Sequence, residues 1–264
     1  MKVNDSIIQA FINDKEIDKC IYNQIIEGKD LFTQPDYKRK EVVIELNKQV
    51  NETIESFSLF NSSLIKKLFP SYEAILKQLI IMPLVGVTPP LDLLKLELNH
   101  QSVLIIDLQQ IANYSHEIDK MMYIIINFIT QEIVRLCIET DYPKNVPLNY
   151  ADKMSYLVFS EGLISYISWG NDYRNYQLIT QKYAEKRGMN FMKLSQAMEI
   201  KEEYFQTKLL NMATQGEFWD RFGIIAGMFL WDIIGDEEKE EGILQAYKNG
   251  WKSFIPKTDE ERNQ

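Results

Sequence analysis

The sequence predicts an α+β fold that is predominantly helical, with a small, mainly antiparallel sheet at about residues 80–108 and a helical half after it. Within these bounds short apolar runs, several rich in β-branched residues, replace the helical spacing of apolar residues. Helical spacing holds on both sides of this region. No Ser/Gly-rich linker and no internal repeat divides the chain. We therefore expect an N-terminal helical region over residues 1–79 and a domain over residues 80–264, joined as one continuous compact unit.

The first third of the chain is predicted to be helical. Ser6 is a typical N-cap residue, and a break is expected near Asn13 and Asp14, where the apolar spacing is interrupted. Pro70 closes a short helix, because proline lacks the backbone N–H that a helix interior requires. The expected helices cover residues 6–27, 35–57, 63–69 and 72–79.

Three segments predict the strands of the sheet. Residues 80–87 are apolar and rich in β-branched residues, although Pro83 would confine them to an edge or a strand end. Leucines at positions 94, 96 and 98 alternate with Lys95 and Glu97, which is the period of a half-buried strand. A turn at residues 99–102 leads into a more apolar strand at 103–108. The last two segments therefore predict a hairpin.

From Ala112 onward the chain is predicted to be entirely helical. Small side chains at Gly223, Ala226 and Gly227 would permit close packing of the helix that carries them. The methionine and aromatic residues of the 189–212 region are expected in the core: Met189, Phe191, Met192, Met198, Tyr204, Phe205 and Met212. The expected helices cover residues 114–139, 150–169, 172–187, 190–212, 217–234 and 237–249.

Composition and charge disfavour several classes of function. The chain has 264 residues, of which 45% are hydrophobic, so it can bury a sizeable core. The net charge is -9 and the densest basic run is only residues 38–40, so no nucleic acid partner is expected. The N-terminal residues lack a signal-like apolar core, and the longest apolar run, 121–126, is far shorter than the roughly 20 residues of a membrane span. We expect a cytoplasmic protein with no membrane partner, and Cys20 and Cys137 as buried thiols.

Two short polar segments carry the functional prediction. A buried helix over residues 121–140 contains Gln131-Glu132-Ile133-Val134-Arg135, and Ser160-Glu161-Gly162 follows, with Glu161 26 residues beyond Arg135. The first segment aligns with the HExxH motif of zinc proteases, and the second is similar to the EG segment that follows it in the gluzincin type. Over about residues 80–235 the chain resembles predicted bacterial Zn-dependent proteases with a zincin-like fold.

The resemblance implies that positions 131, 135 and 161 bind zinc and that position 132 is the catalytic base. Only Glu132 and Glu161 carry over, because both histidine positions are changed, to Gln131 and Arg135. A neutral amide is a poor zinc ligand, and a guanidinium, which is effectively always protonated, repels a cation. The ordinary zinc site cannot form, so we expect no cofactor and a chain that has lost the activity of the family.

His100 and His116 are the two histidines of the chain and could in principle replace the missing ligands. His116 lies about 22 Å from Gln131 along a straight helix that rises 1.5 Å per residue. His100 falls in a predicted turn. A relocated metal site is therefore disfavoured.

Arg135 suggests a replacement for the metal. Its guanidinium could pair with Glu161, and also with Glu132, so that buried carboxylates stay compensated without an ion. The alternative is that Gln131 and Arg135 are ordinary polar residues at a helix edge and that Glu132 is solvated. The sequence leaves both interpretations open.

The functional hypotheses follow from these residues. The first is a catalytically inactive, metallopeptidase-like protein that binds a peptide or protein partner in the relict cleft, beside an exposed strand. That pocket could be lined by Tyr166, Trp169, Tyr173 and Tyr176, although helix packing explains these residues equally well. The second is an active hydrolase that uses the carboxylate pair Glu132 and Glu161, or a metal-dependent peptidase or hydrolase with zinc or another metal at an atypical site. The third is a helical regulatory or scaffold protein.

Overall fold

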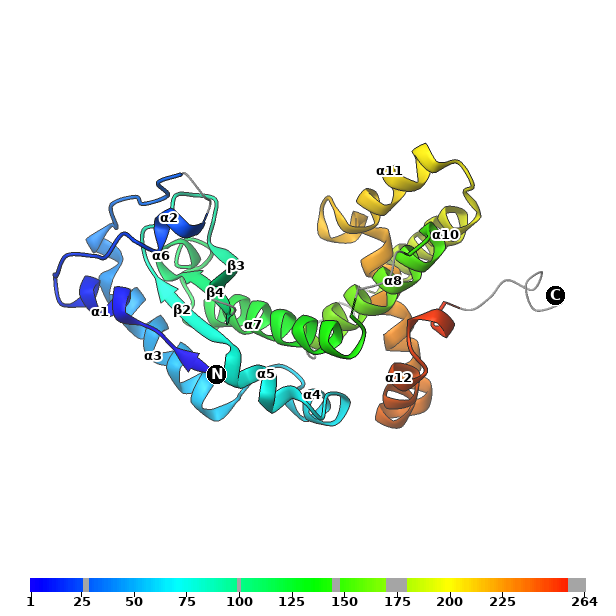
Figure 1. Cartoon of the computed structure of the whole chain (residues 1–264), viewed down its shortest axis with the longest axis horizontal. Coiled ribbons are helices and arrows are strands. Elements are labelled where there is room, and N and C mark those ends of the chain that lie inside the picture. The colour runs from blue at the N-terminus through cyan, green and yellow to red at the C-terminus, as the bar shows by residue number, and fades with distance from the viewer. Residues whose placement is uncertain (26–28, 99–100, 144–147, 170–179, 256–264) are drawn as a thin grey trace. The chain divides into compact units, whose positions relative to one another are not determined.

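A computed structural model describes residues 1–25, 29–98, 101–143, 148–169 and 180–255, and the chain divides into two compact units (Figure 1). The first unit comprises Met1–Ser62 and Ser71–Ile133, and the second comprises Ser63–Pro70 and Val134–Gln264. The division expected between residues 79 and 80 therefore falls inside the first unit. The N-terminal region and the sheet belong together because a strand at the very start of the chain pairs with the strand that begins at Ile80. The predicted class, α+β and mostly helical, is confirmed.

The first unit contains a four-stranded mixed sheet in the order β1-β2-β4-β3. The strands β2 and β4 are parallel, as are β1 and β2, and only β3 and β4 are antiparallel. The predicted hairpin is thus confirmed, whereas the prediction of a mainly antiparallel sheet is wrong. Apolar spacing identifies strands but not which of them pair, and β1 is too short to carry any periodicity. The strands are β1 (Lys2–Val3), β2 (Ile80–Leu84), β3 (Leu93–Leu98) and β4 (Gln101–Asp107).

Pro83 occupies a position on β2 where the sheet does not need a backbone N–H group as a hydrogen-bond donor. The carbonyl groups of Leu79 and Ile81 accept hydrogen bonds from the β1 side, from Lys2 and Asn4 respectively. Alternate residues of a strand face the same neighbour, so the backbone of Pro83 also faces the β1 side. Because β1 ends at Val3, the missing N–H of Pro83 costs the ladder nothing, although β2 lies inside the sheet.

Helices of the first unit pack around this sheet. On α3 the buried residues Val43, Leu46, Val50 and Ile54 recur at the expected helical spacing. The helix α1 packs against α3 and β2, and α3 also packs against α6. The helices of this unit are α1 (Ser6–Ile12), α2 (Tyr22–Ile25), a 3-10 turn (Tyr37–Arg39), α3 (Lys40–Ser56), α5 (Tyr72–Gln78), α6 (Leu108–Ile111) and the first part of α7 (Ile118–Asp141).

Asp107 fixes the loop between β2 and β3. Its side chain is fully buried at the end of β4, where it accepts hydrogen bonds from the backbone N–H groups of Val87 (2.7 Å), Gln109 (2.9 Å) and Gln110 (2.9 Å). Burial raises the pKa of Asp107 to about 6, against the opposing effect of these hydrogen bonds. The carboxylate therefore organises the backbone that leads into β3, the edge strand.

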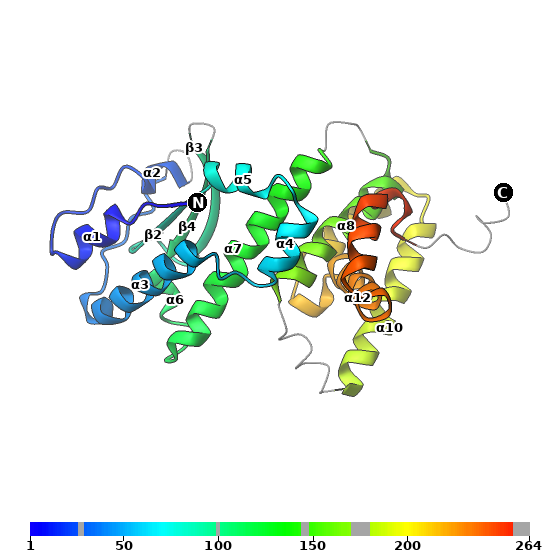
Figure 2. The same ribbon diagram turned by 90° about the horizontal axis from the view of Figure 1, so that it is seen from below.

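The second unit is helical in the residues described. Its core is the contact between α8 and α12, and Figure 2 shows α8, α10 and α12 close together. A Cβ added at Gly227 would lie 2.0 Å from the carbonyl oxygen of Val158, and one at Gly162 would lie 2.4 Å from the carbonyl carbon of Gly227. The expected close packing at Gly227 is thus confirmed. The elements of this unit are α4 (Ser62–Leu68), the end of α7, α8 (Tyr150–Ser168), α10 (Thr180–Glu199), α11 (Glu203–Thr214), the 3-10 turns Phe218–Asp220 and Trp251–Ser253, and α12 (Phe222–Asn249).

Several helix boundaries differ from the prediction. The helix α10 runs through Gly188, where a break was expected, and ends before a break at residues 200–202, where the prediction was continuous. The two last predicted helices are joined as α12, with a kink at Lys239 (φ 62°, ψ -158°). A glycine in a helical pattern is thus a weaker boundary signal than tertiary packing.

In the part of the chain that the structure describes, the helix α7 is long and apolar enough, by length and composition alone, to cross a membrane. More than half of its most apolar stretch, 56%, is buried within the protein. The same length and composition occur in core helices of globular proteins.

Candidate functional site

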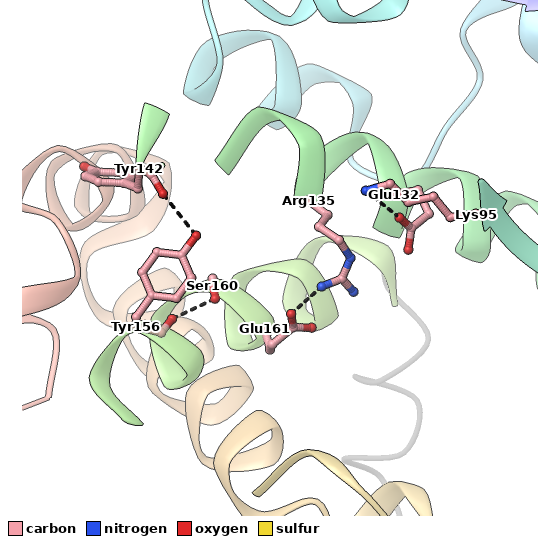
Figure 3. Close-up of polar contacts among 7 residues, drawn as sticks. All are labelled: Lys95, Glu132, Arg135, Tyr142, Tyr156, Ser160 and Glu161. Carbon is pink, nitrogen blue, oxygen red and sulfur yellow. Dashed lines mark hydrogen bonds and ion pairs between the residues drawn. The ribbon is translucent and has the colours of Figure 1, made fainter. Parts of the chain in front are cut away.

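Glu132 lies in the first unit, where its partner is a strand residue. Its carboxylate is 3.7 Å from the ammonium of Lys95 on β3, and the residue is only 8% exposed (Figure 3). Lys95 lies opposite Leu104 in the β3–β4 ladder. Because Lys95 pairs with Glu132 of α7, the face of the hairpin that carries Lys95 is turned toward α7. The interpretation of Glu132 as a solvated residue is therefore wrong. Sequence reasoning missed Lys95, whose alternation with leucines had indicated an outward-facing residue.

Arg135 and Glu161 lie in the second unit and form an ion pair, in which the guanidinium donates to the carboxylate (Figure 3). Their side chains retain 24% and 21% of their exposure. The predicted pairing of Arg135 with Glu161 is confirmed. Each partner comes from a long helix, α7 and α8, so the pair is held by regular secondary structure rather than by loops.

The residues around Glu161 on α8 have structural roles of their own. Ser160 donates to the carbonyl of Tyr156 four residues earlier (2.7 Å), and Gly162 permits the close contact with Gly227. Helix packing therefore explains the serine and the glycine of the Ser-Glu-Gly segment without a metal. In this segment the described ion pair with Arg135 is made by Glu161.

Tyr156 lies next to the pair and contacts the chain beyond α7. Its hydroxyl donates to the carbonyl of Tyr142 (3.1 Å), as drawn in Figure 3. Burial, followed by the charges of Glu139 and Glu161, raises the pKa of Tyr156 to about 12, and the charge of Arg135 partly opposes this rise. Tyr156 therefore acts as a neutral hydrogen-bond donor at ordinary pH.

The remaining predicted site residues are placed as follows. Gln131 donates to the side chain of Asn127 (2.5 Å), one turn earlier on the same helix. Tyr166 is buried. A Cβ added at Gly235 would lie 2.5 Å from the hydroxyl oxygen of Tyr166, so this side chain packs against α12. Trp169 packs against Phe218, with ring centroids 4.6 Å apart. Both aromatic residues thus take part in helix packing. Tyr173 and Tyr176, the other aromatic residues considered for a pocket, lie outside the described residues.

Within the described ranges, no group of three His, Cys, Asp or Glu side chains is arranged to hold a metal ion. His116 is exposed and precedes the start of α7, and His100 lies outside the described residues. Cys137 is buried, which raises the pKa of its thiol to about 12. Cys20 is exposed, so the expectation that both thiols are buried is wrong for that residue.

The methionine and aromatic residues of α10 and α11 were expected in the core, and most of them are exposed. The buried apolar residues in the described parts of these helices are Leu194 and Ala197 of α10 and Ala213 of α11. Larger apolar side chains occupy the outer face: Met189 (37% exposed), Met192 (55%), Tyr204 (78%), Phe205 (50%) and Met212 (47%). This part of the prediction is wrong, because residue type was given more weight than position on the helix.

Another buried acid, Asp232, lies on α12 and contacts α10. Asp232 is 5% exposed and accepts a hydrogen bond from the hydroxyl of Tyr183 (2.7 Å). Burial, followed by the nearby charge of Asp236, raises the pKa of Asp232 to about 7. No sequence pattern indicates a role for this residue, since an Asp within an apolar helix does not reveal its partner.

Comparisons with protein-family models, with curated proteins and with solved structures found no match for this chain. The resemblance to zinc proteases therefore rests on residues 131–135 and 160–162 alone.

Proposed function

We propose that this chain is a catalytically inactive, metallopeptidase-like protein that binds an extended segment of a partner protein along β3. One observation carries the loss of activity. The two carboxylates that such an enzyme would use, Glu132 and Glu161, each lie in an ion pair with a cation of the chain, Lys95 and Arg135. A carboxylate that is already paired with a cation of the chain is less available to a metal ion, because the ion would have to displace that cation or lie beside it.

Strand addition is supported by the position of β3 in the sheet. This strand ends the strand order, and none of its six residues is buried. The N–H of Asp107 donates to the carbonyl of Asp92 (2.7 Å), which makes these two residues a hydrogen-bonded pair of the antiparallel ladder. Because such pairs alternate with non-bonded ones, Leu94 and Leu96 direct their backbone groups at β4, whereas those of Lys95 and Glu97 are directed outward.

The N–H of Leu93 supports the same alternation. It donates to the side chain of Asp92 (2.9 Å) instead of to β4. The outward backbone groups of β3 form the kind of edge to which an extended peptide adds as a further strand. Lys95 joins the two parts of the proposal, since the same residue lies in the edge strand and pairs with the relict base Glu132.

Zinc binding tests the inactive state. The full chain is incubated with excess zinc and dialysed, and its metal content and peptidase activity on a denatured protein substrate are measured. We expect no stoichiometric zinc and no hydrolysis. Bound zinc that is lost in Glu161→Ala, together with zinc-dependent hydrolysis, would instead establish the enzyme, which is the principal alternative.

Restoring the motif tests the metallopeptidase likeness. The double variant Gln131→His/Arg135→His recreates two histidines at i and i+4 on one helix, the spacing that binds zinc in HExxH. We expect it to bind one zinc ion, whereas the control Gln131→Leu/Arg135→Leu binds none. A double variant that folds and binds no more zinc than the control would contradict the proposed origin.

Strand addition is tested with a displayed library of random short peptides selected on the full chain. Glu97→Pro removes an outward N–H of β3 without touching the bonds to β4, and Glu97→Gln is the matched control. We expect the selected peptides to bind Glu97→Pro at least about tenfold more weakly than Glu97→Gln, a loss of about 1.4 kcal/mol. Peptides that bind both variants equally would place the binding surface elsewhere.

A further inference from the structure

We propose that the strand added along β3 is β3 of a second copy of this chain, paired antiparallel with Leu96 of both copies on the twofold axis. The proposal rests on the strand addition described above and identifies the partner. The result would be one continuous sheet across the dimer, with β3 of each copy at its centre. An isologous contact of this kind requires that the strand be complementary to itself.

The charges of β3 select this register. Outward-facing residues must pair with outward-facing residues, so the axis passes through a residue and not between two residues. In the charged part of β3 the candidates are Lys95, Leu96 and Glu97. An axis at Lys95 opposes two ammonium groups, and an axis at Glu97 opposes two carboxylates, which is unfavourable between directly opposite residues. With the axis at Leu96, Lys95 of each copy lies opposite Glu97 of the other. Both charged residues then have an opposite charge across the contact.

The leucines of β3 fit the same register. Leu94, Leu96 and Leu98 lie on the opposite face from Lys95 and Glu97, because side chains alternate along a strand. None of the three is buried within the chain. With the axis at Leu96, the two Leu96 residues are opposite one another and Leu94 of each copy faces Leu98 of the other. The apolar positions therefore meet only apolar positions.

The pairing of Lys95 with Glu132 is compatible with this contact. The Lys95 side chain keeps 31% of its exposure, and its ammonium lies 3.7 Å from the Glu132 carboxylate, so it can also approach Glu97 of the second copy. Glu97 is exposed at the edge. The dimer would thus place a second carboxylate beside the cation that neutralises the relict base.

A disulfide trap tests the register. In this arrangement the two Leu96 residues form a non-hydrogen-bonded pair with Cα atoms about 4.5 Å apart, a separation that a disulfide can span. The two Leu94 residues would be about 13 Å apart, four residues along extended strands. In a Cys20→Ser background, we expect Leu96→Cys to form a covalent dimer under mild oxidation and Leu94→Cys to form none. Equal cross-linking of the two variants, or none with Leu96→Cys, would overturn the register.

Light scattering on the unmodified full chain tests the dimer itself. We expect a dimer at high micromolar concentration whose dissociation constant rises at least tenfold in Glu97→Lys, which opposes two ammonium groups, and changes less in Glu97→Gln. A monomer at this concentration overturns the dimer. If selected peptides still lose affinity for Glu97→Pro, only the identity of the partner is wrong. If those peptides are also insensitive to Glu97→Pro, strand addition at β3 is wrong as well.

Discussion

Removal of Arg135 should expose how much the ion pair with Glu161 contributes to stability. Exposed pairs contribute about 0–1 kcal/mol, whereas breaking a fully buried pair costs about 3–5 kcal/mol. The two side chains are 24% and 21% exposed, which places the pair between these limits. We therefore expect Arg135→Leu to lower the free energy of unfolding by about 1–3 kcal/mol, since Glu161 would remain in a partly desolvated site without this partner.

The assay is a double-mutant cycle measured by urea unfolding, with Arg135→Leu, Glu161→Gln and the double variant. The cycle isolates the interaction from the cost of losing each side chain, and we expect a coupling energy of about 1–2 kcal/mol. A matched control is the pair Lys48 and Glu52, one turn apart on α3, whose charged atoms are 4.0 Å apart and whose side chains are each 63% exposed. Its coupling should be at most about 0.5 kcal/mol. A cycle at Arg135 and Glu161 that gives no more than the control would refute the idea that the guanidinium replaces a metal ion.

Three further perturbations test the framework that holds the site. Gly227→Ala should destabilise the chain by at least about 2 kcal/mol in thermal or urea unfolding, because the added Cβ would lie 2.0 Å from a backbone oxygen. The control is Gly188→Ala, which has open space around the added Cβ and should be neutral or stabilising by up to about 1 kcal/mol. Asp107→Asn should cost about 1–3 kcal/mol in urea unfolding, because an amide cannot accept from all three backbone donors and its NH₂ group would face one of them. The pKa of Asp232 is raised to about 7 in the fold, so folding takes up a proton and stability falls as the pH rises from about 4 to about 7. The pKa of Asp107 is raised to about 6, so Asp107 acts in the same direction below that pH. Asp232→Asn should therefore reduce the dependence of the melting temperature on pH, most clearly between about pH 6 and about pH 7.

Local patterns predicted the parts of the fold that depend on local interactions. The buried face of α3 follows a 3.6-residue period, and the hairpin of β3 and β4 has alternating residues close to its turn, so both could be predicted from spacing. The parallel pairing of β2 with β4 could not be predicted from spacing. It joins segments about 20 residues apart through a loop fixed by Asp107, and nothing in the apolar pattern distinguishes that pairing from an antiparallel one.

The partner of a charged residue could be predicted only where few oppositely charged residues were candidates. Arg135 stands at a position where the resemblance to zinc proteases implies a ligand, and the same resemblance indicated Glu161 as the acid opposite it. Glu132 instead has Lys95 as a partner, from a strand 37 residues earlier, and a strand residue that alternates with leucines is normally assigned to solvent. Tertiary packing decides which face of a hairpin a helix covers. The sequence of the hairpin alone does not indicate that face.

For the proposed origin from a metal site, the ion pairs are stronger evidence than the match to the protease motif. Gly162 is required by the crossing of α8 and α12 whether or not a metal was ever bound, and Ser160 hydrogen-bonds within its own helix, so their match to the protease segment can arise from packing alone. Glu161 has no such explanation, since a partly buried carboxylate on a packed helix is costly unless something compensates its charge. Arg135 supplies that compensation, at one of the positions that the resemblance assigns to a zinc ligand. The decisive quantity is therefore the coupling between these two side chains, because a random surface pair would show little of it and a replaced metal site would show much.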